Sequence, residues 1–253
     1  MKNNHKITIL IPCFNEEKGI GKVIDAIPYT FLSHMGLQIE VIVIDNNSTD
    51  KTANIAKEKN VRVIHELKKG KGHALKTGFT SISDDTTLVV MLDGDNTYKA
   101  KEIPRLIEPL ISNFCDVVIG SRLGGKVKMN SLKLPNRIAN WGYTFLVRQF
   151  YGANTTDLLS GFVAWKKRVV DHLHPHLESE GFTIEMEMVT KMSKLGFEMY
   201  SVPITYDSRE GFSKVDVLTD GIKVLHMLIK NLTWKPRNKS SDKFPFNTLS
   251  QSY

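Results

Sequence analysis

Two aspartates separated by one glycine directly follow an apolar segment, and they are the residues that point most clearly to chemistry. Residues 88–98 read Leu-Val-Val-Met-Leu-Asp-Gly-Asp-Asn-Thr-Tyr. The apolar run is short, which indicates a buried strand, so Asp93 and Asp95 stand where that strand leaves the sheet. Ligands of open α/β sheets bind beside the carboxyl ends of strands, and a hard divalent ion such as Mg²⁺ that carries substrate phosphates would join two such carboxylates. An Asp-Gly turn that caps a helix is the alternative.

Polar residues also follow two other apolar segments. The first segment continues as Pro12-Cys13-Phe14-Asn15-Glu16-Glu17, and the second continues as Asp45-Asn46-Asn47-Ser48-Thr49-Asp50. Ser48 and Asp50 are good helix N-caps. Asp45 ends a strand, where a carboxylate can accept hydrogen bonds from a base or a ribose hydroxyl. Three acidic strand ends together predict one nucleotide site.

Apolar, β-branched segments alternate with helical patterns along the chain. Strands are predicted at 7–11, 41–44, 61–64, 88–92, 117–119, 161–165 and 197–204, and helices at 17–27, 50–58, 71–82, 102–112, 133–150, 183–195 and 215–232. We therefore expect an α/β fold of right-handed βαβ units, with a Rossmann-like, mostly parallel central sheet flanked by helices in a single domain.

We expect this domain, residues 1–232, to have two halves. Residues 1–120 would bind the nucleotide and residues 121–232 the acceptor, with a glycine-rich loop at 120–125 between them. The basic, polar tail at 233–253 is expected to be flexible.

The composition narrows the class of partner. The net charge of +7 favours anionic partners such as nucleotides, phosphorylated lipids and membrane surfaces. Nucleic acid is not expected, because the basic residues are scattered and no motif interleaves them with aromatic residues. Cys13 and Cys115 lie in or beside apolar segments and are expected to be buried thiols. We find neither a signal peptide nor an uncharged apolar stretch of about 18 residues, so no membrane span is expected.

The ordered motifs, over roughly residues 6–230, resemble the family 2 glycosyltransferases of GT-A fold. In the first half the resemblance rests on Pro12 with Asn15-Glu16-Glu17, on residues 43–52, and on Asp93-Gly94-Asp95. The second half is similar to the dolichyl-phosphate mannose, glucose and N-acetylglucosamine synthases. The motifs there are Gly120-Ser121-Arg122, Asn136-Arg137, residues 157–162, Val202-Pro203-Ile204, Arg209 and Gly211-Phe212-Ser213-Lys214.

The resemblance implies an activity. A hexose or N-acetylhexosamine would pass, with inversion, from a nucleotide-sugar to dolichyl or another polyprenyl phosphate, as in glycan assembly for protein N-glycosylation. The enzyme would work as a peripheral protein at the cytoplasmic face of a membrane. The resemblance does not indicate whether the protein forms oligomers.

The resemblance also implies residue roles. The donor would contact Pro12, Asn15, Glu17, Asp45, Asn47 and Gly94, together with Asp93 and Asp95, which would bind Mg²⁺ or Mn²⁺. The acceptor phosphate would contact Arg122, Arg137, Ser213 and Lys214, and the catalytic set would be Asp95, Arg122, Arg137 and Arg209. A planar guanidinium suits a phosphate, because it donates two parallel hydrogen bonds.

The chain departs from the family's usual motifs at four positions. Cys13 replaces a small or aromatic residue, Asn46 replaces an aspartate and Asn47 a glycine. Thr97 stands where the mannose-transferring members have glutamine. These differences favour a UDP-linked sugar over GDP-mannose.

Two further segments carry candidate residues. The basic run at 68–73 opens a predicted helix, so Lys71 and Gly72 would approach the donor at a helix N-terminus, with a basic turn as the alternative. Glu185 and Glu187 lie on different faces of a helix, where one orients the acceptor or a catalytic arginine, or both are exposed acids. The alternating histidines at 172–176 have only their spacing in favour of a metal site, and we do not expect one.

The expected reaction chemistry and the sequence pattern narrow the class of acceptor. A lipid monophosphate needs no general base, because its second pKa is about 6 and it is mostly a dianion at pH 7. No histidine is expected at a strand end near the acids. The helix at 215–232 either packs in the core or lies at a lipid surface.

Four alternatives stay open. They are a glycosyltransferase that acts on a polysaccharide or protein, a sugar nucleotidyltransferase, a non-catalytic binding subunit and, weakest, a nucleic-acid-binding protein. Against the nucleotidyltransferase, the segment after the first strand lacks a Gly-rich loop with an arginine. Against the binding subunit, the acids and arginines are all present.

Overall fold

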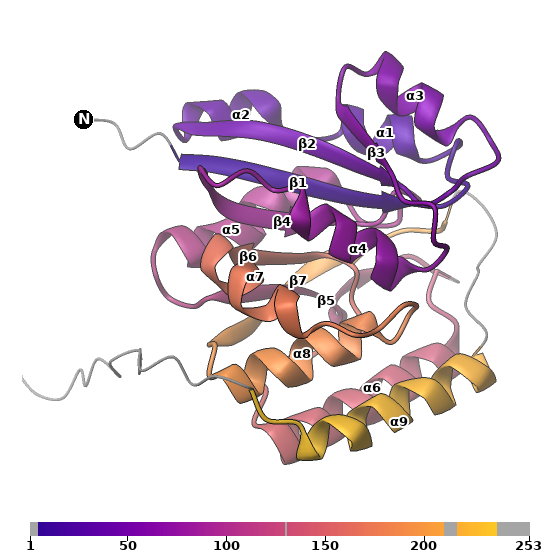
Figure 1. The fold of residues 1–253 in the computed structure, drawn as a ribbon, viewed down its shortest axis with the longest axis vertical. Coiled ribbons are helices and arrows are strands. Elements are labelled where there is room, and N and C mark those ends of the chain that lie inside the picture. Colours follow the sequence, from indigo (N-terminus) through magenta and orange to yellow (C-terminus); the bar gives the residue numbers. More distant parts are fainter. Residues whose placement is uncertain (1–4, 130, 210–216, 237–253) are drawn as a thin grey trace, which may run out of the picture.

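Seven strands form one mixed sheet with helices on both faces (Figure 1). The computed structural model describes residues 5–129, 131–209 and 217–236, with only the backbone of 217–220. The strands are β1 (His5–Cys13), β2 (Leu37–Asp45), β3 (Arg62–His65), β4 (Thr86–Met91), β5 (Val117–Val127), β6 (Val163–Lys166) and β7 (Met199–Tyr206). Their order is β3-β2-β1-β4-β6-β5-β7. Only β6 runs antiparallel to its neighbours, which confirms the predicted mostly parallel sheet.

Helices connect these strands in the expected alternation. They are α1 (Ile20–Asp25), α2 (Tyr29–His34), α3 (Thr52–Glu58), α4 (Lys71–Thr80), α5 (Ile103–Ile111), α6 (Leu134–Tyr151), α7 (Lys167–Leu173), α8 (Ile184–Leu195) and α9 (Val217–Thr233). The sequence patterns did not predict α2 and α7, which have six and seven residues.

The prediction of a glycine-rich loop at 120–125 is wrong. Strand β5 continues through this segment and pairs with β7 as far as Tyr206. A side chain on Gly125 would collide with the backbone of Ile204, and one on Gly120 would press on Ile204 and Phe162. The glycines therefore allow close approach of neighbouring backbone rather than a turn.

Alternation along the strands divides the core between the two faces of the sheet. Leu10 and Ile42 pack with α4 and α8 on one face, whereas Ile9 packs with α1 and α5 on the other. Residues i and i+2 of a strand share a face, so the buried runs supply both layers. Cys13 and Cys115 are buried free thiols, as predicted.

Helices α6 and α9 lie side by side at the end of the molecule away from β1–β3 (Figure 1). The hydroxyl of Tyr143 on α6 donates to the carbonyl of Gly221 on α9 at 3.0 Å. Val224, Met227 and Leu228 of α9 are buried in the core. In the described part of the chain, no helix combines the length and the apolar character needed to cross a bilayer.

Candidate active site

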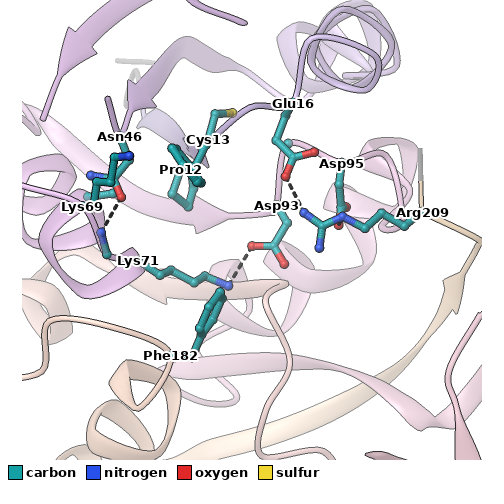
Figure 2. A pocket seen from close by; sticks show the side chains of 14 residues that line it. Pro12, Cys13, Glu16, Asn46, Lys69, Lys71, Asp93, Asp95, Phe182 and Arg209 are labelled. Atoms are coloured by element: carbon teal, nitrogen blue, oxygen red, sulfur yellow. Dashed lines mark hydrogen bonds and ion pairs between the residues drawn. The ribbon is translucent and has the colours of Figure 1, made fainter. Parts of the chain in front are cut away.

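A pocket of about 350 Å³ opens at the edge of the sheet where β1, β2 and β4 end (Figure 2). Fourteen residues line it: Pro12, Cys13, Phe14, Glu16, Asn46, Lys69, Gly70, Lys71, Ala74, Asp93, Gly94, Asp95, Phe182 and Arg209. Strands in a parallel sheet end at one edge, so polar residues that are distant in sequence meet here.

The two aspartates that follow β4 face this pocket, each beside a cation. Asp93 Oδ1 lies 2.7 Å from Lys71 Nζ, and Asp95 Oδ2 lies 3.4 Å from Arg209 Nε. Asp95 Oδ1 accepts from the Thr97 amide at 3.0 Å and from the Thr97 hydroxyl at 2.6 Å. Burial and the neighbouring Asp93 raise the pKa of Asp95, although Arg209 and Thr97 act in the opposite direction.

Lys71, at the start of α4, joins the two halves of the site. Its ammonium lies 2.7 Å from Glu185 Oε1 on α8 as well as from Asp93. Burial alone would lower the pKa of Lys71, but the two carboxylates outweigh burial and raise that pKa. Glu185 and Glu187 are both buried, so the alternative of exposed helix acids is wrong. Glu187 pairs with Lys191 inside the core at 2.6 Å.

Of the two glutamates after β1, Glu16 faces the pocket. Glu16 is 7% exposed and pairs with Arg209. Glu17 does not line the pocket, and its carboxylate accepts from the Lys51 amide at 3.1 Å. Asn15 has a positive φ of 52°, and its side-chain oxygen accepts from the Thr49 amide at 2.8 Å. This turn links the ends of β1 and β2 and directs Glu16 inward, a placement that the sequence reasoning missed.

Asp45, at the end of β2, is buried, and one of its two carboxylate oxygens contacts a histidine. Oδ2 lies 3.1 Å from Nδ1 of His65, whereas Oδ1 is buried and has no hydrogen-bond partner among the described residues. His65 ends β3, so the expectation that no histidine stands at a strand end near the acids is wrong. The parallel pairing of β2 with β3 places the two residues side by side. Neither residue is among the fourteen that line the pocket.

Asn46, which the sequence reasoning treated only as a departure from the family pattern, lines the pocket. Its amide donates to the carbonyl of Lys68 at 2.7 Å, and its side-chain oxygen accepts from the Gly70 amide at 2.7 Å. Asn47 is exposed and donates to the carbonyl of Leu67 at 3.2 Å. Both asparagines hold the segment that leads into α4.

Three glycines of the site owe their identity to close packing. A side chain on Gly72 would collide with the carbonyl of Ser179, one on Gly94 with Cys13, and one on Gly161 with the carboxylate of Asp93. Gly72 therefore lets the loop before α8 pack against the first turn of α4.

Two of the predicted arginines lie apart from the pocket lining. Arg122 is buried in β5, and its guanidinium donates to both oxygens of Asp157, each at 2.8 Å. Arg137 is exposed near the start of α6. Ser213 and Lys214 lie outside the described residues.

The donor set suits a hard divalent cation. Asp93 and Asp95 offer two carboxylates at the pocket, whereas the described residues contain no cluster of three or more metal-binding side chains. Mg²⁺ commonly takes one or two carboxylates and completes its shell with substrate phosphates and water. The residues present therefore fit an ion that arrives with a phosphorylated ligand.

Comparison with known proteins gives consistent matches. The family described as "Glycosyl transferase family 2" matches residues 8–173. The Dolichyl-phosphate hexose transferase of Haloferax volcanii is 28% identical, over 88% of this chain and 92% of the relative. The Undecaprenyl-phosphate mannosyltransferase of Micrococcus luteus is also 28% identical, over 83% and 87%.

Among solved structures, glucosyl-3-phosphoglycerate synthase from Mycobacterium tuberculosis superposes with a TM-score of 0.70 at 22% identity. The match covers 91% of this chain and 81% of that one, whose crystals hold Mn²⁺, UDP-glucose and phosphoglyceric acid. This likeness confirms the GT-A-like fold.

Proposed function

The chain belongs to glycosyltransferase family 2, and we propose that it transfers a sugar from a nucleotide-sugar to a polyprenyl phosphate such as dolichyl phosphate. The donor would be a UDP-linked hexose or N-acetylhexosamine. The observation that carries the proposal is the pocket in which paired carboxylates meet two cations, Lys71 and Arg209. The names of the two polyprenyl-phosphate relatives support the acceptor.

The donor's nucleoside would bind at the ends of β1 and β2. Oδ1 of buried Asp45 supports this, because it has no partner in the part of the chain that the structure describes and could accept an N–H from the base or an O–H from the ribose. Asn15, Glu17 and Asn47 would shape the rim, since their side chains hold the turns at these strand ends. Pro12, Gly94 and Gly72 would contact the donor through backbone surfaces.

The diphosphate would bind at Asp93 and Asp95 through Mg²⁺ or Mn²⁺. The ion would stabilise the negative charge on the departing nucleoside diphosphate. Lys71 supplies a further cation 2.7 Å from Asp93.

The acceptor phosphate would approach from the side of Arg209. Two anions repel each other, and a guanidinium that already lies 3.4 Å from Asp95 would offset that repulsion. We propose that Arg137, Ser213 and Lys214 add contacts to this phosphate. Arg122 would act mainly by holding Asp157 and the segment that leads into β6.

The reaction would be a single displacement with inversion. An oxygen of the lipid phosphate attacks the anomeric carbon, and the bond from that carbon to the diphosphate oxygen breaks. The phosphate is mostly a dianion at pH 7, since its second pKa is about 6, so no side chain has to remove a proton.

A cationic apolar surface supports a lipid acceptor. Leu134, Ile138, Trp141 and Phe145 of α6, with Ile222, Leu225, Ile229 and Leu232 of α9, are 41–72% exposed. Helix α6 contains no acidic residue and two arginines, and α9 has Lys223 and Lys230 against one acid, Asp220. Apolar side chains among cations favour the surface of an anionic bilayer, where the enzyme would bind peripherally. A second copy of the same surface would bring like charges together.

The test is product analysis. The protein would be incubated with Mn²⁺, a panel of UDP- and GDP-sugars and a polyprenyl phosphate, and the lipid fraction analysed by mass spectrometry. We expect one sugar attached to the lipid phosphate and no product in EDTA. Undiminished transfer in EDTA, or no sugar attached to the lipid phosphate with any donor of the panel, would reject the proposal.

A further inference from the structure

Lys71 contacts the carboxylate that a metal ion would need. Its ammonium lies 2.7 Å from Oδ1 of Asp93, one of the two oxygens that this carboxylate could offer to a divalent cation. The same ammonium lies 2.7 Å from Glu185 Oε1. A metal ion at the same oxygen would repel the ammonium strongly at such distances, so the binding of an ion at Oδ1 requires Lys71 to give up this contact.

Glu185 is suited to hold the ammonium of Lys71 when Asp93 binds a metal ion instead. It is 6% exposed and does not line the pocket, so it holds the lysine from the side away from the donor. An unpaired ammonium at this depth would be costly, and Glu185 supplies a charge that the metal does not take.

The backbone fixes the two residues relative to each other. The amide of His73, two residues after Lys71, donates to the carbonyl of Glu180 at 3.2 Å. Gly70 and Gly72 pack against the backbone of residues 179–180 so closely that neither position has room for a side chain. The start of α4 therefore stays in place beside α8 while the lysine side chain changes partners.

We propose that Lys71 is the resident cation of the donor site and that Glu185 is its positioning residue, which retains the ammonium when a divalent ion binds Asp93. The inference rests on the proposed metal-dependent transfer. Lys71 would then turn toward the donor's diphosphate, still charged and still held by α8. Glu185 thus influences metal affinity without contacting the metal.

The test is a titration with Mn²⁺ alone, without nucleotide or lipid, followed by electron paramagnetic resonance of the free ion. Glu185→Gln removes the charge and leaves Asp93 as the lysine's charged partner, so we expect Mn²⁺ to bind about tenfold more weakly. The double variant Lys71→Met with Glu185→Gln removes the competing cation, so its affinity should equal or exceed that of the unmodified protein.

The matched control is Glu40→Gln. Glu40 does not line the pocket, and its carboxylate lies 3.1 Å from the ammonium of Lys6, so this variant breaks an ion pair elsewhere in the protein. The inference would be overturned if Glu185→Gln bound Mn²⁺ as tightly as Glu40→Gln does. It would also be overturned if the double variant bound Mn²⁺ more weakly than the unmodified protein. If Glu185→Gln does not fold, as judged by circular dichroism, the double variant decides alone. An unmodified protein that binds no Mn²⁺ would instead reject the metal site of the proposed function.

Discussion

At the scale of single residues, Asp95 carries a buried charge that destabilises the fold, and it faces the pocket. Its carboxylate is 4% exposed and close to a second carboxylate, which raises its pKa above the ordinary 3.8. A folded-state pKa above the unfolded value means that the charged form destabilises the fold at higher pH. A buried charge of this kind is typical of functional sites, where a bound ligand offsets its electrostatic cost.

Replacing Asp95 with asparagine should therefore separate stability from function. At pH 7 we expect the metal-free Asp95→Asn variant to melt about 2 °C higher, because asparagine keeps the Thr97 contacts without the buried charge. Well below pH 3.8, the ordinary pKa of an aspartate, Asp95 is protonated in both the folded and the unfolded state, so the difference should vanish. The measurement is thermal unfolding by circular dichroism.

The same experiment with Mn²⁺ provides the functional control. Mn²⁺ should raise the melting temperature of the unmodified protein but not that of the variant, and the variant should transfer no sugar. A variant that is less stable at pH 7 and responds equally to Mn²⁺ would contradict this account of Asp95.

At the scale of elements, the contact between α4 and the loop before α8 joins the donor and acceptor halves. This contact depends on glycine at position 72, because a side chain there would collide with the Ser179 carbonyl. The glycines of β5 have a similar role beside β7. The sequence patterns instead predicted a loop at 120–125 and a donor contact at Gly72, since spacing alone does not reveal a neighbouring backbone.

Gly72→Ala should thus destabilise the protein by about 1–3 kcal/mol, the usual cost of overpacking. Gly142→Ala is the matched control, because Gly142 lies inside α6 and an added methyl group would meet no atom within 4 Å. That control should be stabilised by about 0.5–1 kcal/mol. Urea unfolding measures both, and equal effects at the two glycines would refute the packing argument.

At the scale of the whole molecule, the carboxyl ends of β5 and β7 lie at the same edge of the sheet as the pocket. Helix α6 follows β5 and α9 follows β7, so the apolar surface of these two helices begins near the site. A lipid acceptor whose chain stays in a bilayer would reach the pocket from that surface.

The aromatic pair on α6 offers a direct test of this arrangement. Trp141 and Phe145 stack with ring centroids 6.1 Å apart, and they are 64% and 50% exposed. Replacing both with serine should abolish sedimentation with phosphatidylglycerol-containing vesicles and leave the melting temperature within about 2 °C, since exposed side chains contribute little to stability.

Phe31→Ser on α2 is the control, because Phe31 is also an exposed aromatic residue, 55% exposed, and α2 lies at the opposite end of the molecule (Figure 1). Unchanged vesicle binding of the Trp141 and Phe145 double variant would rule out this surface.

The sequence by itself determined the fold class and the acidic strand ends. Strand and helix periods are local, and a strand that ends in Asp93 and Asp95 places them at the sheet edge in any such fold. Only the tertiary structure decided that Glu16 rather than Glu17 faces the pocket, that Asp157 holds Arg122, and that Glu185 meets Lys71. Those outcomes depend on turns and on contacts between residues distant in sequence, which no local period encodes.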